Sequence, residues 1–220
     1  MKKQLAGMAM SALVIFSASV FSQVTVQPGL MVGVGIYGES QTGVSLSSNT
    51  GFMGGGLLDI SFNNIVSLRP GIEYVARGAS MSENGEDSDG VPLNISANLT
   101  LNYLAIPIDV KVKIPTASPG FCPYALVGLN TAFLLSANAK ETASGDGESV
   151  TENTDVGSYF TTIDFGLDLG VGADIPVGNI IPFVEFSYYL GIANVDATAG
   201  DPSLTNHGFE IKAGIKFKTY

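Results

Sequence analysis

The chain has 220 residues, a formal net charge of −10 and a mean hydropathy of +0.31. This length suits one domain, and the acidic balance excludes nucleic acid as an expected partner, because nucleic-acid binding needs basic surface. One cysteine and one histidine exclude an intrachain disulfide and a metal site built from clustered His or Cys side chains.

The N-terminus has the features of a signal peptide. Lys2 and Lys3 precede an apolar stretch at 5–20, and Val20-Phe21-Ser22 offers a cleavage point before Gln23. We therefore expect residues 1–22 to direct export and to be removed. The alternative is a retained anchor. No later segment has the eighteen consecutive apolar residues of a transmembrane helix.

Four segments with period-two alternation follow, at 24–36, 52–62, 68–77 and 99–114. Each sets apolar residues on one face against polar residues or glycine on the other, which is the signature of a strand. In the fourth, the apolar residues are odd-numbered up to Tyr103 and even-numbered from Leu104 onward. We expect a β-bulge near Tyr103 to Pro107 to correct the facing.

Four more alternating segments lie at 124–133, 160–175, 184–192 and 208–218. In the second of these, Asp164 and Asp168 share a face with glycines, while Phe165, Leu167 and Leu169 form the other face. A helix would mix these two sets on every side.

The connections alternate in length. Long polar ones lie at 38–50, 79–96, 136–157 and 194–206, and short ones at 63–64, 115–120 and 176–179. This is the layout of bacterial outer-membrane barrels. We expect residues 23–220 to form an all-β, eight-stranded antiparallel up-and-down transmembrane β-barrel, with short periplasmic turns and long extracellular loops. A soluble sandwich or lipocalin-like barrel is the alternative, and it would turn its charged face to solvent.

If the charged face points inward, it fills a lumen that eight strands leave only wide enough for side chains. The set holds seven basic and eight acidic residues, which is nearly balanced, and buried charges must be paired or hydrated. We predict a salt-bridge network that plugs the lumen, with a narrow porin-like channel as the alternative. Its members are Asp59, Arg69, Glu73, Arg77, Asp109, Lys111, Lys113, Asp164, Asp168, Asp174, Glu185, Glu210, Lys212, Lys216 and Lys218.

The long connections are acidic. We interpret them as a solvated face that contacts a protein or a surface polymer, while lipid surrounds the barrel. Weak binding of divalent cations is an alternative, because Ca²⁺ takes carboxylate oxygens. Twelve acids stand there against Lys140: Glu39, Glu83, Glu86, Asp87, Asp89, Glu141, Asp146, Glu148, Glu152, Asp155, Asp196 and Asp201.

No catalytic motif or cofactor site is expected. Asp164 and Asp168 could form an acid–base pair, but pairing with cationic neighbours is the simpler interpretation. His207 could serve a lipid-modifying outer-membrane enzyme together with Ser203 or Asp201, but the G-x-S-x-G motif is absent. We therefore predict a non-enzymatic protein of the outer membrane.

Several strand motifs resemble those of the PorT-like outer-membrane β-barrel domain family, which is widespread in Bacteroidota. The segment 101–107, Leu-Asn-Tyr-Leu-Ala-Ile-Pro, is similar to the family's YxxIP strand, and Pro123-Tyr124 leading to Gly128 is similar to the next. Segments 164–172, 186–191 and 214–217 resemble the last three strands. The resemblance covers the mature chain and implies an outer-membrane barrel without specifying a role.

Overall fold

The computed structural model describes residues 24–41, 47–86, 92–117, 120–145, 148–198 and 203–219, so the expected signal peptide lies outside the described residues. All ten strands belong to one antiparallel sheet. They are β1 (Thr25–Gln41), β2 (Ser47–Ser61), β3 (Val66–Arg77), β4 (Ala79–Glu86), β5 (Pro92–Lys113), β6 (Cys122–Gly145), β7 (Glu148–Asp155), β8 (Ile163–Asp174), β9 (Ile180–Gly191) and β10 (Leu204–Phe217), with a 3₁₀ turn η1 (Gly157–Tyr159) between β7 and β8.

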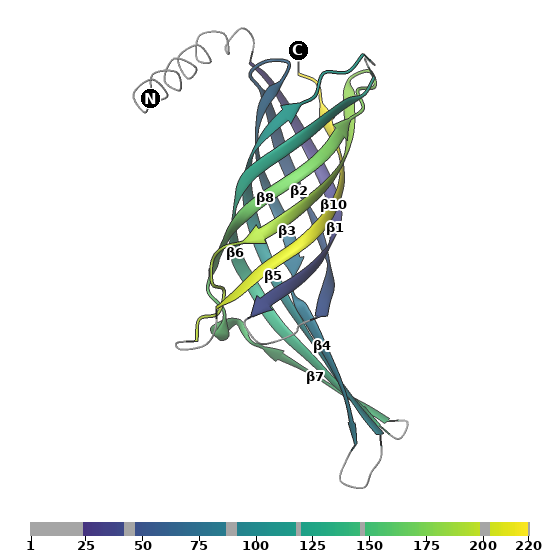
Figure 1. Ribbon diagram of the computed structural model, residues 1–220, viewed down its shortest axis with the longest axis vertical. Helices are drawn as coiled ribbons and strands as arrows, with labels where there is room; N and C mark the ends of the chain where they lie inside the picture. Colours follow the sequence, from purple (N-terminus) through teal and green to yellow (C-terminus); the bar gives the residue numbers. More distant parts are fainter. Residues whose placement is uncertain are drawn as a thin grey trace, which may run out of the picture.

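Eight of these strands close a ring. The pairing runs β1-β2-β3-β5-β6-β8-β9-β10 and returns to β1, which gives the barrel in Figure 1. The prediction of an all-β antiparallel fold is confirmed, but the described residues form ten strands. β4 continues β3 beyond Gly78, whose φ of 153° favours glycine. β7 lies within a connection that was expected to be a loop.

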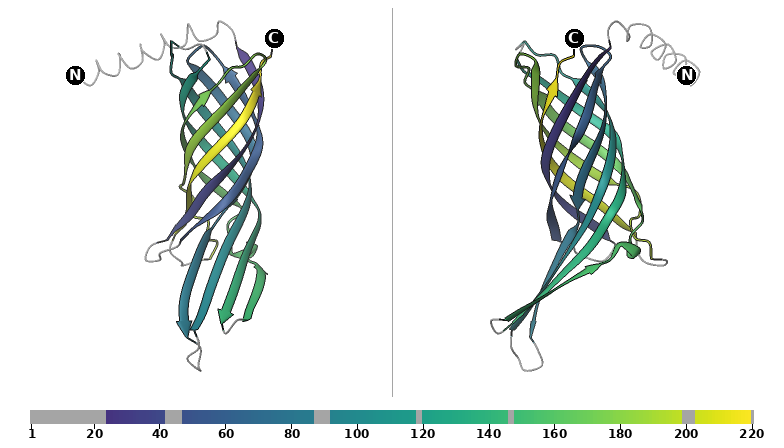
Figure 2. Two further views of the ribbon diagram at one scale, coloured as in Figure 1. Left: turned by 90° about the vertical axis from the view of Figure 1, so that its right-hand side faces the viewer. Right: turned by 180° about the vertical axis from the view of Figure 1, so that it is seen from behind.

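A four-stranded sheet projects from one end of the ring, as Figures 1 and 2 show. Its order is β4-β5-β6-β7, with Met81 paired to Ala97 and Glu141 paired to Glu152. The prediction of loops at 79–96 and 136–157 is therefore wrong for most of their length. These stretches are polar on both faces, so they lack the alternation that reveals a half-buried strand, yet their backbones pair all the same.

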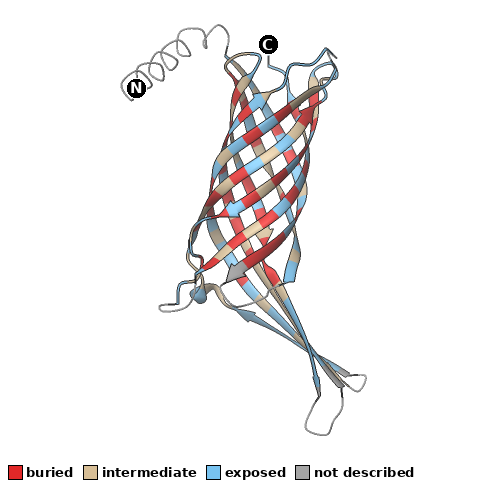
Figure 3. Cartoon of the chain, viewed as in Figure 1, coloured by how far each residue is buried: buried red, intermediate tan, exposed pale blue. Residues whose placement is uncertain are grey.

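Along the ring strands, buried and exposed residues alternate, as the colouring of Figure 3 shows. The outward face is apolar: Leu30 is 65 % exposed, Val171 57 % and Ile211 60 %. The charged residues of the same strands face inward and are buried. A soluble barrel has the opposite arrangement, with its apolar face inside.

On β5 the apolar residues are odd-numbered up to Tyr103 and even-numbered from Leu104, yet the odd-numbered side chains point inward on both sides of this change. Leu101, Tyr103, Asp109 and Lys111 all point inward. The register does shift between Asn102 and Tyr103, but the unpaired extra residue is Leu135 on β6. The predicted bulge was thus assigned to the wrong strand. The apolar pattern changes because the barrel interior becomes apolar at this level, so inward positions there are no longer polar.

That apolar layer lies toward the projecting sheet and includes Tyr37, Met53, Val75, Leu101 and Tyr103. Val156 and Phe160, which flank η1, pack against it from the connection between β7 and β8. Two backbone hydrogen bonds join this connection to the connection between β9 and β10. The Thr161 amide donates to the Val195 carbonyl at 2.9 Å, and the Ala197 amide donates to the Tyr159 carbonyl at 2.9 Å. Side chains therefore occupy this end of the interior.

Two neighbouring glycines of β2 provide a matched test of the inward face. A Cβ atom at Gly55 would lie 2.1 Å from the Ile72 carbonyl oxygen, whereas one at Gly54 would meet nothing closer than 3.6 Å. We predict that Gly55→Ala lowers the free energy of unfolding by about 1–3 kcal/mol, because β2 must move away from β3. Gly54→Ala should be neutral or slightly stabilising. Urea unfolding in detergent micelles measures both, and equal midpoints for the two variants would contradict the packing described.

Candidate functional site

The charged interior of the ring is the candidate site. Among the residues that the structure describes, nine carboxylates and five basic side chains are buried, an excess of four acids. The acids are Glu39, Asp59, Glu73, Asp109, Asp164, Asp168, Asp174, Glu185 and Glu210, and the bases are Arg69, Arg77, Lys111, Lys212 and Lys216.

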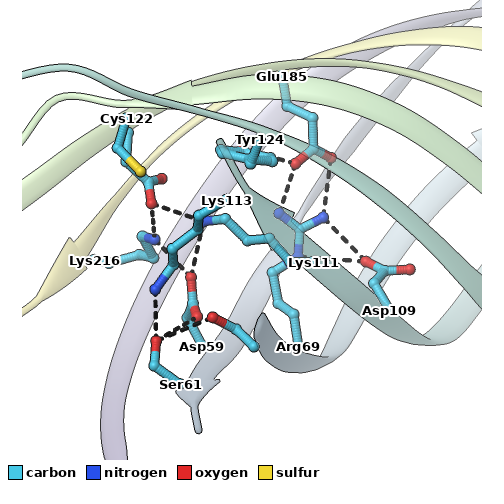
Figure 4. A network of polar contacts seen from close by, with 12 residues as sticks. Asp59, Ser61, Arg69, Asp109, Lys111, Lys113, Cys122, Tyr124, Glu185 and Lys216 are labelled. Carbon is cyan, nitrogen blue, oxygen red and sulfur yellow. Dashed lines mark hydrogen bonds and ion pairs between the residues drawn. The ribbon is translucent and has the colours of Figure 1, made fainter. Parts of the chain in front are cut away.

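At the short-turn end, two lysines and two aspartates form a closed set. The Nζ of Lys111 donates to Asp59 Oδ2 at 2.9 Å and to Asp174 Oδ2 at 2.7 Å. The Nζ of Lys216 donates to the same two oxygens at 2.7 and 2.8 Å. The four residues come from β2, β5, β8 and β10, so the set links opposite walls of the ring (Figure 4).

The half-buried Lys113 lies beside this set, and its Nζ donates to Ser61 Oγ at 2.7 Å. Figure 4 shows both residues next to Asp59. The short-turn end of the interior thus holds three lysines and two aspartates, and the excess of acid must lie farther along the barrel.

Arg69 of β3 is the centre of the next set. Its guanidinium donates to Glu185 through Nη1 at 2.5 Å and Nη2 at 3.1 Å, and to Asp109 Oδ2 through Nη2 at 3.0 Å (Figure 4). The hydroxyl of Tyr124 donates to the same glutamate at 2.9 Å. A planar guanidinium suits this two-oxygen contact, which a lysine could not reproduce.

Lys212 and Glu210 form a third set on β10. The Nζ of Lys212 lies 2.9 Å from Glu210 Oε2 and 3.8 Å from Glu73 Oε2. Glu210 also accepts hydrogen bonds from the Tyr37 hydroxyl at 2.7 Å and from Ser187 Oγ at 2.9 Å. Glu210 is therefore well satisfied, whereas the contact between Lys212 and Glu73 is long.

Arg77 occupies the level nearest the apolar layer. Its Nη1 donates to Asp164 Oδ2 at 2.8 Å, and its guanidinium lies 3.6 Å from the ring centroid of Tyr189. Asn206 donates to the same aspartate oxygen at 2.9 Å. Asp164 thus has the cationic partner that the alternation led us to expect.

Three expectations about the interior are wrong. Asp168 makes no ion pair within the described part of the chain and accepts a hydrogen bond from Asn130 Nδ2 at 2.9 Å. Glu39 was assigned to a solvated loop, but β1 extends through it and turns it inward, where it is 6 % exposed. Lys218 lies beyond β10 and is exposed. The predicted near-balance of charge therefore becomes an excess of acid.

Four fully buried tyrosines were missed as members of the interior. The alternation does place Tyr124 and Tyr189 on the polar face, with Asn130 on β6 and Glu185 on β9, but the predicted set held charged residues alone. Inward glycines make room for the rings: a Cβ at Gly172 would lie 2.5 Å from Tyr124 Cζ, and one at Gly208 would lie 2.3 Å from Tyr37 Cδ1. This explains why glycines are frequent on the polar face. The four are Tyr37, Tyr103, Tyr124 and Tyr189.

The described ranges contain no group of three or more His, Cys, Asp and Glu side chains placed to hold a metal ion. Within the same ranges, no helix has the length and apolar character needed to cross a membrane. His207 lies on β10, paired with Gly38 and Leu190. Ser203 precedes that strand and is exposed, and Asp201 lies outside the described residues.

Arg69 gives a direct test of the network. We predict that Arg69→Met lowers the free energy of unfolding by about 3–5 kcal/mol, because it leaves Asp109 and Glu185 buried without their cation. Adding Glu185→Gln should restore part of the loss. Lys140→Met, on the exposed end of β6, is the control and should change nothing. Urea midpoints in micelles measure all four proteins, and a fall no larger than that of the control would contradict the network.

The chain was compared with protein-family models, curated proteins and solved structures. Residues 14–197 match the model of the outer membrane protein beta-barrel domain family. No curated protein matches the chain. Among solved structures, it is similar to Neisserial surface protein A, with 14 % identity over 87 % of this chain and 97 % of that one and a TM-score of 0.47. The attachment invasion locus protein Ail of Yersinia pestis is 16 % identical over 87 % of this chain and 98 % of its own, with a TM-score of 0.38. OprG of Pseudomonas aeruginosa is 12 % identical over 90 % of this chain and 95 % of its own, with a TM-score of 0.40. Because the family model spans most of its length, the chain belongs to the outer membrane protein beta-barrel domain family and is a protein of the outer membrane.

Proposed function

We propose that the chain is an integral outer-membrane protein that acts without catalysis, by presenting its projecting sheet and long connections to a partner outside the cell. The observation that carries this proposal is the filled interior. Ion-paired side chains and an apolar layer occupy the barrel, so the surface left for function is the one that extends beyond the membrane.

The outward apolar face supports a membrane-spanning placement, with outer-membrane lipid as the surrounding partner. Leu30, Val34, Val171 and Ile211 are each more than half exposed around the ring. The short connections that follow β2, β5 and β8 lie at the end opposite the projecting sheet, as Figure 1 shows. Outer-membrane barrels keep such short turns in the periplasm, which would place the projecting sheet outside the cell.

The projecting sheet is acidic and solvated. Glu83, Glu141, Glu152 and Asp155 are exposed on it, and Lys140 is the base among its described residues. Met81 and Val150 add exposed apolar surface, at 49 % and 72 %. A protein or surface polymer that carries basic groups beside an apolar patch would complement this surface. Weak divalent-cation binding by these acids remains the smaller alternative.

A narrow porin-like channel is the second candidate. The observation that favours it is the excess of buried acid, which would prefer cations. The layer around Met53, Leu101 and Tyr103 opposes it, because these side chains are fully buried and the polar side chain at their level, Arg77, is held by Asp164. The lipid-modifying alternative that uses His207 is not favoured, because the sequence lacks the G-x-S-x-G nucleophile motif.

Two finer assignments belong to this proposal. The PorT-like character rests on the strand motifs, above all Tyr103-Leu104-Ala105-Ile106-Pro107 on β5. Export rests on the basic and apolar pattern of residues 1–22. Processing of the exported chain before Gln23, read by N-terminal sequencing, would support the second assignment.

Membrane placement predicts a depth-dependent response to charge. Ile211→Arg sets a cation on the outward face in the middle of β10, and we expect it to lower stability in bilayers by about 2–4 kcal/mol. Val150→Arg, at an apolar position on β7 that is even more exposed, is the control and should have no such effect. Unfolding from lipid vesicles measures both variants. Equal stability of the two would argue against a lipid contact at Ile211.

The functional proposal is tested by combining conductance with site-specific crosslinking. In planar bilayers we expect no single-channel conductance step. A clear conductance step would contradict the filled interior and favour the channel instead. A photoreactive group at Val150 should give a defined adduct on intact cells, whereas the same group at Ile211 should give lipid adducts. Neutralising Glu83, Glu141 and Glu152 as glutamines should weaken the Val150 adduct. Absence of any protein or polymer adduct at Val150 would contradict the interaction role.

A further inference from the structure

A row of three residues crosses the middle of the barrel wall. Asp109 on β5 is paired with Gly128 on β6, which is paired in turn with Asp168 on β8. A Cβ atom at Gly128 would lie 2.1 Å from Asp109 Oδ1, so that carboxylate leans over the glycine toward β8. Because neighbouring strands are about 4.8 Å apart, both carboxylates border the space above Gly128.

Three buried oxygens around this space have no hydrogen-bond partner. They are the Oδ1 atoms of Asp109, Asn130 and Asp168, whose residues are 3 %, 3 % and 2 % exposed. The remaining polar atoms are used: Asp109 Oδ2 accepts from Arg69, and Asp168 Oδ2 accepts from Asn130 Nδ2. Asn130 lies two residues after Gly128 on the same face, so its free oxygen borders the same space. Buried acceptors of this kind require a donor or a cation.

The neighbouring bases are already engaged. Arg69 is held by Asp109 and Glu185, and Lys212 lies 2.9 Å from Glu210 and 3.8 Å from Glu73. The described interior still has four more buried carboxylates than bases, and the half-buried Lys113 lies at the short-turn end, beside Ser61. An uncompensated buried carboxylate is costly, so Asp168 must gain a counter-ion or a proton.

We propose that Asp109, Asn130 and Asp168 bind one monovalent alkali cation inside the barrel. The free ligands are all hard oxygens, without nitrogen or sulfur, which excludes the sites that zinc or copper prefer. Calcium takes roughly six to eight oxygen ligands, more than the three free oxygens here, and one of the two carboxylates is shared with Arg69. A single positive charge matches Asp168, whose nearest base, Lys212, forms its ion pairs with Glu210 and Glu73.

The test compares unfolding in sodium chloride with unfolding in N-methylglucamine chloride at equal ionic strength. A ligand that binds the folded state stabilises it by mass action, so the urea midpoint of the wild-type protein should rise with the sodium concentration. Asp168→Asn should remove this dependence. Lys140→Met, on the exposed end of β6, is the control and should keep it in full.

A second measurement covers the case in which Asp168→Asn does not refold. Wild-type protein should broaden the ²³Na resonance, and added potassium should reverse the broadening. Asn130→Asp, which adds a third carboxylate, should shift the preference toward calcium. Equal wild-type midpoints in sodium and N-methylglucamine, or a ²³Na resonance without broadening, would overturn the proposal and assign a proton to Asp168 instead.

Discussion

The structure depends on closure of the ring of backbone hydrogen bonds. A sheet surrounded by hydrocarbon cannot leave N–H and C=O groups unpaired, and closing β10 onto β1 removes the open edges at that depth. Closure then fixes two environments for every strand, lipid outside and a narrow interior inside. Because side chains alternate across a strand, each ring strand must be apolar at one parity and polar, small or aromatic at the other. Beyond the ring the requirement ends, and β4 and β7 form polar strands in water.

The small interior explains which residues occupy it. Eight strands leave space for side chains and little else. Tyrosine rings fill much of the cross-section, and the glycines facing them, such as Gly172 beside Tyr124 and Gly208 beside Tyr37, are the sites where another side chain would collide. Long basic side chains reach across the remaining space, so that Arg69 on β3 meets Glu185 on β9 and Lys216 on β10 meets Asp59 on β2. The network thereby ties together strands that are far apart in the ring.

The sequence predicts this arrangement well where the strand has lipid on one side. Period-two alternation predicted the facing of the ring strands, apart from the part of β5 before Leu104, and most inward charges, including Lys111 and Lys216. The alternation failed to predict the structure where the two faces of a strand lie in similar surroundings or where inward residues are apolar. Residues 79–86 and 148–155 are polar on both sides and were taken for loops. Leu101 and Tyr103 are apolar but inward, which produced a bulge on the wrong strand. Glu39 was not recognised as an inward residue, because the first strand was predicted to end before it. The partners of Asp168 depend on distances across the ring, which a pattern along one strand does not contain.

The central claim is that the apolar face meets lipid. Nitroxide labels at Leu169 and Val171 on β8 test it most directly, after the single cysteine, Cys122, is replaced by serine, with Val150 on β7 labelled as a reference outside the ring. In lipid vesicles we predict that dissolved oxygen relaxes the labels at Leu169 and Val171 strongly while a water-soluble nickel chelate does not. The label at Val150 should respond in the opposite way. Ready access of the chelate to the labels at Leu169 and Val171 would contradict the account.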